Sequence, residues 1–170
     1  MLSNLLTHPL ISRTRRNHAL EHATIHILSQ RFRNLRVMGR STPHGFILYG
    51  DLPTDAVQEA AQEALTRLRA GQRELAVHPT CGTNAVAAGA LAGLGAFLVL
   101  TPRRRNMAEW LSRIPTVLLI STLGFILGQR LGLILQSRLT TDPNVGDMRI
   151  VAVLREERGP MTQHYVYTEG

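Results

Sequence analysis

The chain has 170 residues, enough for one domain or for one domain with an insertion. The 19 residues counted as Lys or Arg are all arginine, and the formal charge is +7. Such a basic balance is typical of proteins that bind nucleic acid or anionic lipid, or whose positive charges set a membrane topology. Aromatic residues are only 5% of the chain and no nucleic-acid-binding motif occurs, so we expect no nucleic-acid partner; the single cysteine, Cys81, excludes an internal disulfide framework.

The first predicted helix carries the most informative motif. Met1–Ser12 lacks a long apolar run, so we do not predict a secretory signal there. A helix is expected over Thr14–Gln30, which contains no Gly or Pro. Within it, His18-Ala-Leu-Glu21-His22 has the spacing H-x-x-E-H. Residues four apart share a helix face, so both imidazoles can bind one zinc ion, with Glu21 as the catalytic base for a metal-bound water.

A further imidazole and two simpler interpretations accompany this motif. His26 lies four residues beyond His22 and extends the same stripe, which makes it an additional candidate ligand. Without a metal, the histidines would be partly buried residues bonded to the backbone, or surface residues. Glu21 would then form a surface ion pair with Arg15 or Arg16.

The next segments alternate between strand and helix patterns. Leu35–Met38 and Gly45–Tyr49 are predicted strands, joined by a turn over residues 39–44 that is rich in Gly, Ser and Pro. Thr54 is the expected N-cap of an amphipathic helix that ends at Gly71. Glu74–Val77 is predicted to be a short strand.

A polar segment then precedes the apolar part of the chain. A helix supplies two ligands to a metal, so further ligands must come from elsewhere. His78 and Cys81, spaced H-x-x-C in His78–Asn84, are the expected partners of the first helix. Cys81 could instead be a nucleophile or a small buried residue at a helix start.

Two apolar segments follow and are predicted to form a transmembrane hairpin. Asn84–Thr101 holds about 17 uncharged residues, and Ile114–Gly128 continues past Arg130 to about 21, lengths that can cross a bilayer. The connector, Pro102–Arg113, is arginine-rich. Small-residue G-x-x-x-G spacings favour a tight hairpin, with a homodimer contact as the alternative; they involve Gly89 and Gly93 in the first span and Gly124, Gly128 and Gly132 in the second.

The remaining segment completes an α+β fold. Thr140–Asp147 is a predicted linker, and Met148–Leu154 and Gln163–Thr168 are two strands around the turn at 158–160. We therefore predict a small helix-strand-strand-helix-strand domain interrupted by a two-helix transmembrane hairpin, with a C-terminal strand pair. The expected divisions are residues 1–83 with the metal site, 84–136 as the hairpin, and 137–170 as the strand pair packing on the first domain.

Two resemblances add to these residues. Asn17–Thr24 (NHALEHAT) and Ala76–Asn84 (AVHPTCGTN), followed by two spans, resemble a family of small, functionally uncharacterised bacterial membrane proteins, which implies a membrane location. The H-x-x-E-H motif alone is similar to inverzincin metallopeptidases, which take a third ligand from a downstream acidic residue. In this chain Glu59 or Glu63 of the second helix would be the comparable acid.

These observations predict a multi-pass protein of the bacterial cytoplasmic membrane whose partner is the lipid bilayer. Both termini are expected in the cytoplasm, because moving a domain of about 80 residues across without a signal is unfavourable. The arginine triplet Arg103–Arg105 argues for the opposite orientation. The expected activity is a zinc-dependent metallohydrolase or peptidase, and the alternative is a non-catalytic membrane adaptor or accessory subunit, with or without a structural metal.

Overall fold

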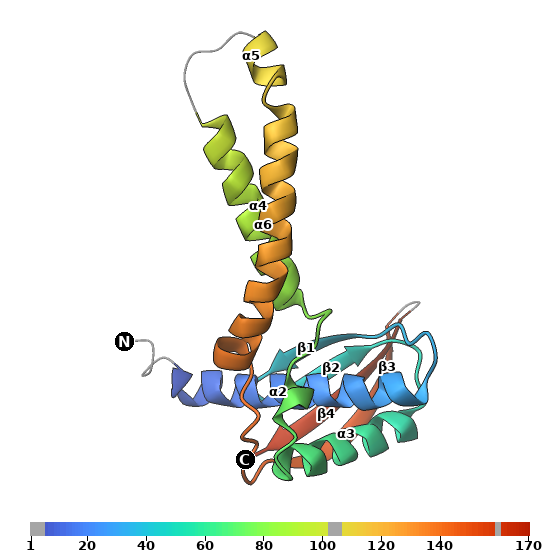
Figure 1. The fold of residues 1–170 in the computed structure, drawn as a ribbon. Helices are drawn as coiled ribbons and strands as arrows, with labels where there is room; N and C mark the ends of the chain where they lie inside the picture. Colours follow the sequence, from blue (N-terminus) through green and yellow to red (C-terminus); the bar gives the residue numbers. More distant parts are fainter. Residues whose placement is uncertain (1–5, 102–106, 159–160) are drawn as a thin grey trace. The chain divides into compact units, whose positions relative to one another are not determined.

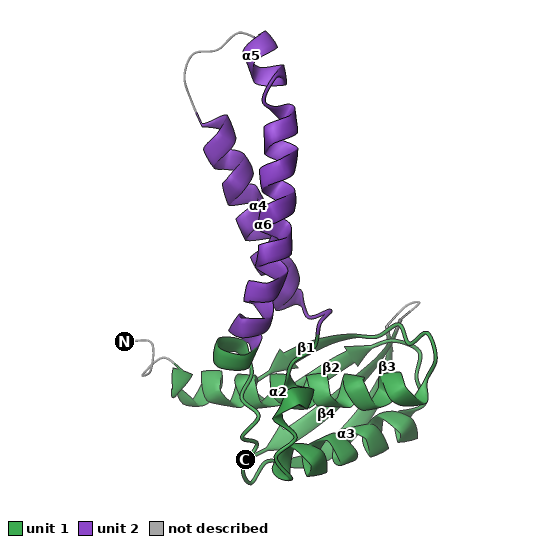
Figure 2. Ribbon diagram, in the orientation of Figure 1, with its two compact units in different colours: residues 1–78, 137–170 green, residues 79–136 purple. Residues whose placement is uncertain are grey.

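The structure is a computed structural model that describes residues 6–101, 107–158 and 161–170. It divides into two compact units, one formed by Met1–His78 with Ser137–Gly170 and the other by Pro79–Gln136 (Figure 2). Chain segments from both sides of the apolar hairpin therefore build the first unit.

The first unit is a four-stranded antiparallel sheet with two helices on one face (Figure 1). The helices are α2 (Pro9–Arg31) and α3 (Thr54–Arg69). The strands are β1 (Met38–Thr42), β2 (Gly45–Tyr49), β3 (Arg149–Arg158) and β4 (Met161–Glu169), and their order in the sheet is β1-β2-β4-β3. The predicted α+β class is confirmed.

The core lies between this sheet and the two helices. Helix α3 buries the apolar face that its amphipathic sequence predicted, and α2 also buries an apolar face. Strands β2 and β4 contribute alternate residues, as strands with one covered face must. The largest fully buried apolar side chains of this layer are Phe46, Leu20, Ile27, Leu28, Leu48, Leu65, Met148, Val57, Val145 and Val166.

The two predicted C-terminal strands are confirmed, and β4 sits in the middle of the sheet. It pairs with β2 through Phe46↔Val166 and Leu48↔His164, and with β3 through Val153↔Val166. The turn predicted at 158–160 lies mostly outside the described residues. Because β4 pairs with strands on both sides, residues 137–170 are an integral part of the first unit.

The prediction for the first strand and its turn was wrong. Leu35–Met38 was expected to be the strand, but β1 spans Met38–Thr42, and residues 39–42 pair with β2 instead of turning. Gly, Ser and Thr are typical of turns, yet here Gly39 and Ser41 face the helix side of the sheet, where contacts with α2 select small residues.

Two shorter predictions also needed correction. Residues Arg73–Ala76 form a 3₁₀ helix, η1, where a strand over Glu74–Val77 was expected. Leu75 and Ala76 are adjacent and both buried, which a strand with alternating faces does not allow. The N-cap of α3 is Pro53, so the predicted cap Thr54 is instead the first helical residue.

The second unit contains the apolar hairpin. It consists of α4 (Gly82–Leu100), the short α5 (Met107–Leu111) and α6 (Ile114–Leu135), which η2 (Gln136–Thr140), a π-helical turn, follows. Two segments, Gly82–Leu100 and Met107–Thr140, are helical, long and apolar enough to cross a membrane. The arginine triplet predicted to lie in the connector falls outside the described residues.

Glycines of α6 bring the two helices into close contact. A Cβ on Gly128 would lie 2.6 Å from the Ala87 carbonyl oxygen, and one on Gly124 would lie 2.8 Å from that of Leu91. In α4, by contrast, nothing among the described residues lies within 4 Å of a Cβ placed on Gly89 or Gly93. The prediction that both helices pack through their G-x-x-x-G motifs is thus right for α6 and wrong for α4, and the homodimer contact stays a prediction.

Candidate metal centre

Helix α2 places three histidines along one stripe. His18, His22 and His26 follow each other at intervals of four residues, and the ring centroids of His18 and His22 are 4.3 Å apart. His22 is buried, with 2% of its surface exposed, and the other two are half-buried. The predicted helical spacing therefore brings the first two imidazoles into contact.

The residue that follows η1 adds a fourth imidazole. The ring of His78 lies 4.6 Å from that of His26 and 5.9 Å from that of His22, measured between centroids. Helix α2 packs beside η1, and this packing brings together residues that are more than 50 positions apart. The first unit thus contains a cluster of four imidazoles, which we call the histidine cluster: His18, His22, His26 and His78.

Backbone carbonyl groups orient the two rings of the H-x-x-E-H motif. Nδ1 of His18 lies 2.9 Å from the Thr140 carbonyl oxygen, and Nδ1 of His22 lies 2.8 Å from that of Ala76. A carbonyl oxygen only accepts, so both Nδ1 atoms donate. In the neutral ring the lone pair is then on Nε2, the arrangement found in most metal-binding histidines.

The other two rings differ from this pair. His26 donates from Nε2 to the Val77 carbonyl oxygen at 2.9 Å, so the lone pair of its neutral ring is on Nδ1. Burial, followed by the nearby imidazoles of His26 and His22, lowers the pKa of His78 to about 4. His78 is therefore neutral at pH 7, which is the form of histidine that coordinates metal ions.

The spacing of His18 and His22 suits a shared ion. A ring nitrogen of His18 and a ring nitrogen of His22 lie within 4.8 Å of each other. Two nitrogens bound to the same tetrahedral Zn²⁺ are roughly 3.4 Å apart, given bonds of about 2.0–2.1 Å. Small rotations of the two side chains would close this difference, so the pair fits a zinc-type ion.

Glu21, the predicted base, lies between α2 and β1. Only 4% of its surface is exposed, and it accepts a short hydrogen bond from the Ser41 hydroxyl. Gly39 lies against the same carboxylate, where any larger residue would overlap it. This is not the exposed pair with Arg15 or Arg16 that the simpler interpretation of Glu21 expected.

The remaining predicted ligands fall in two places. Cys81 belongs to the second unit, where it caps α4 and its sulfur accepts from the Thr83 amide at 3.5 Å. It lies three residues after His78, a stretch that spans at most about 11 Å. On α3, Glu59 and Glu63 form ion pairs with Arg31 at 3.1 and 2.5 Å.

One buried side chain next to the H-x-x-E-H motif was not singled out by the sequence patterns. Asn17, 1% exposed, donates from Nδ2 to the Thr42 carbonyl oxygen at 2.9 Å and accepts from the Thr168 hydroxyl at 2.6 Å. It joins α2 to β1 and β4 one residue before His18. A polar residue next to the apolar stripe of a helix is the only signal that could have indicated this role.

Comparisons with known proteins place the chain in a family but assign no activity. A family model described as "Domain of unknown function (DUF6391)" matches residues 13–153. A relative from Picosynechococcus sp. (strain ATCC 27264 / PCC 7002 / PR-6), described only as an uncharacterized protein, is 36% identical over 106 residues. The alignment covers 57% of this chain and 47% of that relative, so the chain spans about half the relative's length. No solved structure matches.

Proposed function

We propose a function for the chain from its own residues, because it belongs to DUF6391, a family of unknown function that suggests no activity. In this proposal the protein is a membrane-bound, zinc-type metal-binding protein. Its metal ligands are His18 and His22. The observation that carries this proposal is the pair of carbonyl contacts to their Nδ1 atoms, at 2.9 and 2.8 Å. Two rings with the same tautomer, four residues apart on a helix, are prepared to bind one ion through Nε2.

Two further ligands complete a tetrahedral site in this proposal. His78 supports the role because its ring lies 5.9 Å from that of His22 and stays neutral at pH 7. Only two residues separate Cys81 from His78 in the chain, and a thiolate is a strong zinc ligand. With all four ligands bound the site would be closed and structural; with three, one position stays open for water.

The surface of the second unit supports the membrane location. Its two long helices expose large apolar side chains, for example Phe97 at 63% and Leu118 at 63%. Soluble proteins rarely expose apolar surface continuously along two helices, whereas a bilayer solvates it. We therefore place α4 and α6 in the bacterial cytoplasmic membrane.

The catalytic form of the proposal assigns a role to Glu21. A metal-bound water needs a base to deprotonate it, and Glu21 is the carboxylate next to His22 in the motif. Ser41 holds this carboxylate in a fixed position. The substrate would be an amide or ester, and a non-catalytic adaptor with the same ion as a structural clamp is the alternative.

Metal content of the full chain, purified in detergent without chelator, tests the proposal. We expect about one zinc per chain in the wild type and in the control His44→Ala, which removes an exposed histidine of the β1–β2 turn. His22→Ala should lose the metal. Equal metal in all three proteins, or none in the wild type, would refute the metal site and leave the adaptor.

A second variant separates catalysis from structure. Glu21→Gln keeps the size and one acceptor atom of the side chain but removes its basicity. If the site is catalytic, this variant retains zinc and loses at least about a hundredfold of the hydrolysis rate on amide or ester substrates. If wild-type protein with bound zinc hydrolyses none of them, the ion is structural.

A further inference from the structure

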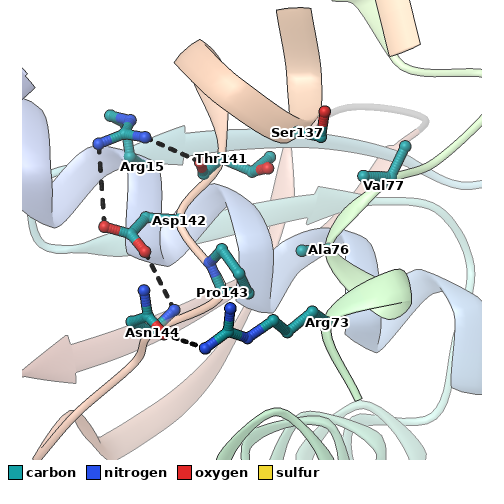
Figure 3. Close-up of a pocket in the computed structure, with 9 residues that line it drawn as sticks. All are labelled: Arg15, Arg73, Ala76, Val77, Ser137, Thr141, Asp142, Pro143 and Asn144. Carbon is teal, nitrogen blue, oxygen red and sulfur yellow. Dashed lines mark hydrogen bonds and ion pairs between the residues drawn. The ribbon is translucent and has the colours of Figure 1, made fainter. Parts of the chain in front are cut away.

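A cavity of about 480 Å³ lies in the first unit, beside the backbone that orients the histidine cluster (Figure 3). Ala76 and Val77 form part of its wall, and their carbonyl oxygens accept from His22 and His26. The volume lies in the range of small-molecule binding sites. Its polar lining residues are Arg15, Arg73, Ser137, Thr141, Asp142 and Asn144.

The lining carries excess positive charge. Arg15 and Arg73 contribute two guanidinium groups, and Asp142 is the only carboxylate among the lining residues. Arg15 is held in place by the carbonyl oxygens of Leu139 at 2.7 Å and Thr141 at 3.1 Å, which carry no net charge. Nη1 of Arg15 lies 3.8 Å from a carboxylate oxygen of Asp142, so the carboxylate offsets only part of the charge.

Arg73 approaches the cavity from another side. Its guanidinium group donates to the side-chain oxygen of Asn144 at 3.3 Å. The backbone N–H of Asn144 in turn donates to the Asp142 carboxylate at 3.0 Å. Figure 3 shows this chain of contacts from Arg15 through Asp142 and Asn144 to Arg73. Asp142 and Asn144 therefore lie between two guanidinium groups, that of Arg15 and that of Arg73.

We propose that this cavity binds the phosphate group of a small molecule or of a lipid. The Arg73 guanidinium group can pair with phosphate through two parallel hydrogen bonds. Arg15, whose Nε and Nη2 atoms donate to the carbonyl oxygens of Leu139, Arg138 and Thr141, contributes its positive charge. The two guanidinium groups lie on different sides of the lining, Arg15 at the upper left and Arg73 at the lower right in Figure 3. A tetrahedral phosphate has oxygen atoms in more directions than a planar carboxylate, which has only two.

Binding of inorganic phosphate to the full chain in detergent tests this inference independently of any metal. We expect phosphate, at constant ionic strength against chloride, to raise the midpoint of thermal unfolding. In Arg73→Gln the half-saturating concentration should rise about tenfold or more, the effect of losing one charge-assisted contact. Arg33→Gln, the same charge change at an exposed residue outside the cavity, should match the wild type.

Two further measurements fix the site and the source of the phosphate. If the phosphate effect disappears in His22→Ala but persists in Arg73→Gln, the anion sits on a metal ion and the proposal is wrong. The midpoint of thermal unfolding is also measured in phosphatidylglycerol nanodiscs and compared with that in lipid-free detergent. An increase that depends on Arg73 identifies a lipid headgroup as the ligand. An Arg73-dependent response to inorganic phosphate identifies a soluble compound. No Arg73-dependent response to either probe overturns the inference.

Discussion

Gly39 of β1 lies against the carboxylate of Glu21 on α2. A Cβ at this position would overlap the end of the Glu21 side chain, and the hydroxyl of Ser41, two residues further along the same strand face, donates to that carboxylate. The strand therefore encloses the one acidic group of the H-x-x-E-H motif. This contact accounts for the small side chains of Gly39 and Ser41, which are typical of a turn in the sequence.

Replacing Gly39 by Ala should destabilise the first unit by about 1–3 kcal/mol, because the buried carboxylate must move from its hydrogen bond with Ser41. The measurement is urea-induced unfolding of the full chain, followed by circular dichroism. Arg40→Ala, at the exposed neighbouring position of β1, is the control and should change stability by less than about 0.5 kcal/mol. Similar values for both variants would show that the contact at Gly39 is unimportant.

The depressed pKa of His78 predicts a loss of stability in mild acid. Above pH 6.5 this histidine is neutral in both the folded and the unfolded chain, so its contribution is constant. As the pH falls from 6.5 to about 4, the unfolded chain binds a proton that the folded one, with a pKa of about 4, does not. Stability should therefore decline across this window, measured by unfolding of metal-free protein.

His78→Asn is the variant that checks the source of this decline. It should make the fall between pH 6.5 and 4 shallower, because it removes a ring whose protonation in the folded chain is opposed by burial and then by His26 and His22. Some decline should remain, since burial also lowers the pKa of His164. An unchanged pH profile in the variant would assign the effect to other groups.

Sequence periodicity predicted the elements whose packing is local. The histidine stripe of α2, the apolar face of α3, the boundaries of β2 and the two apolar helices all follow from patterns within one segment. The position of β1 did not, because its small residues are chosen by Glu21, a residue on another element. The strand expected at Glu74–Val77 failed for a similar reason: it has no neighbouring strand among those of the described sheet.

The candidate site shows the same division. Spacing along one helix predicted that His18 and His22 would meet, and their centroids are 4.3 Å apart. It could not show which ring nitrogen each uses, because the partners are carbonyl groups of Thr140 and Ala76, more than 50 residues away. The cavity with Arg15 and Arg73 was also not predicted, since its walls come from three separate stretches of the chain.

Glu63, once a candidate third ligand, is expected to have no part in metal binding. Its carboxylate pairs with Arg31 and Arg67, both at 2.5 Å, on the outer surface of α2 and α3. Glu63→Gln should retain the wild-type zinc content and lose less than about 1 kcal/mol of stability, as exposed ion pairs contribute little. Metal analysis beside His22→Ala decides this, and loss of zinc in Glu63→Gln would restore the acidic residue to the ligand set.

The hairpin of the second unit should be sensitive to one glycine and indifferent to another. A Cβ on Gly128 would lie 2.6 Å from the carbonyl oxygen of Ala87, a backbone atom that cannot rotate away, so Gly128→Ala must separate α4 from α6. We expect a loss of about 1–3 kcal/mol, although alanine is the better helix former.

Gly89→Ala makes the same chemical change where nothing among the described residues lies within 4 Å, and should be neutral or slightly stabilising in detergent. Thermal unfolding of both variants in detergent compares them directly. If Gly89→Ala were the more damaging, α4 would use its own G-x-x-x-G face, as a contact with a second copy of the chain requires.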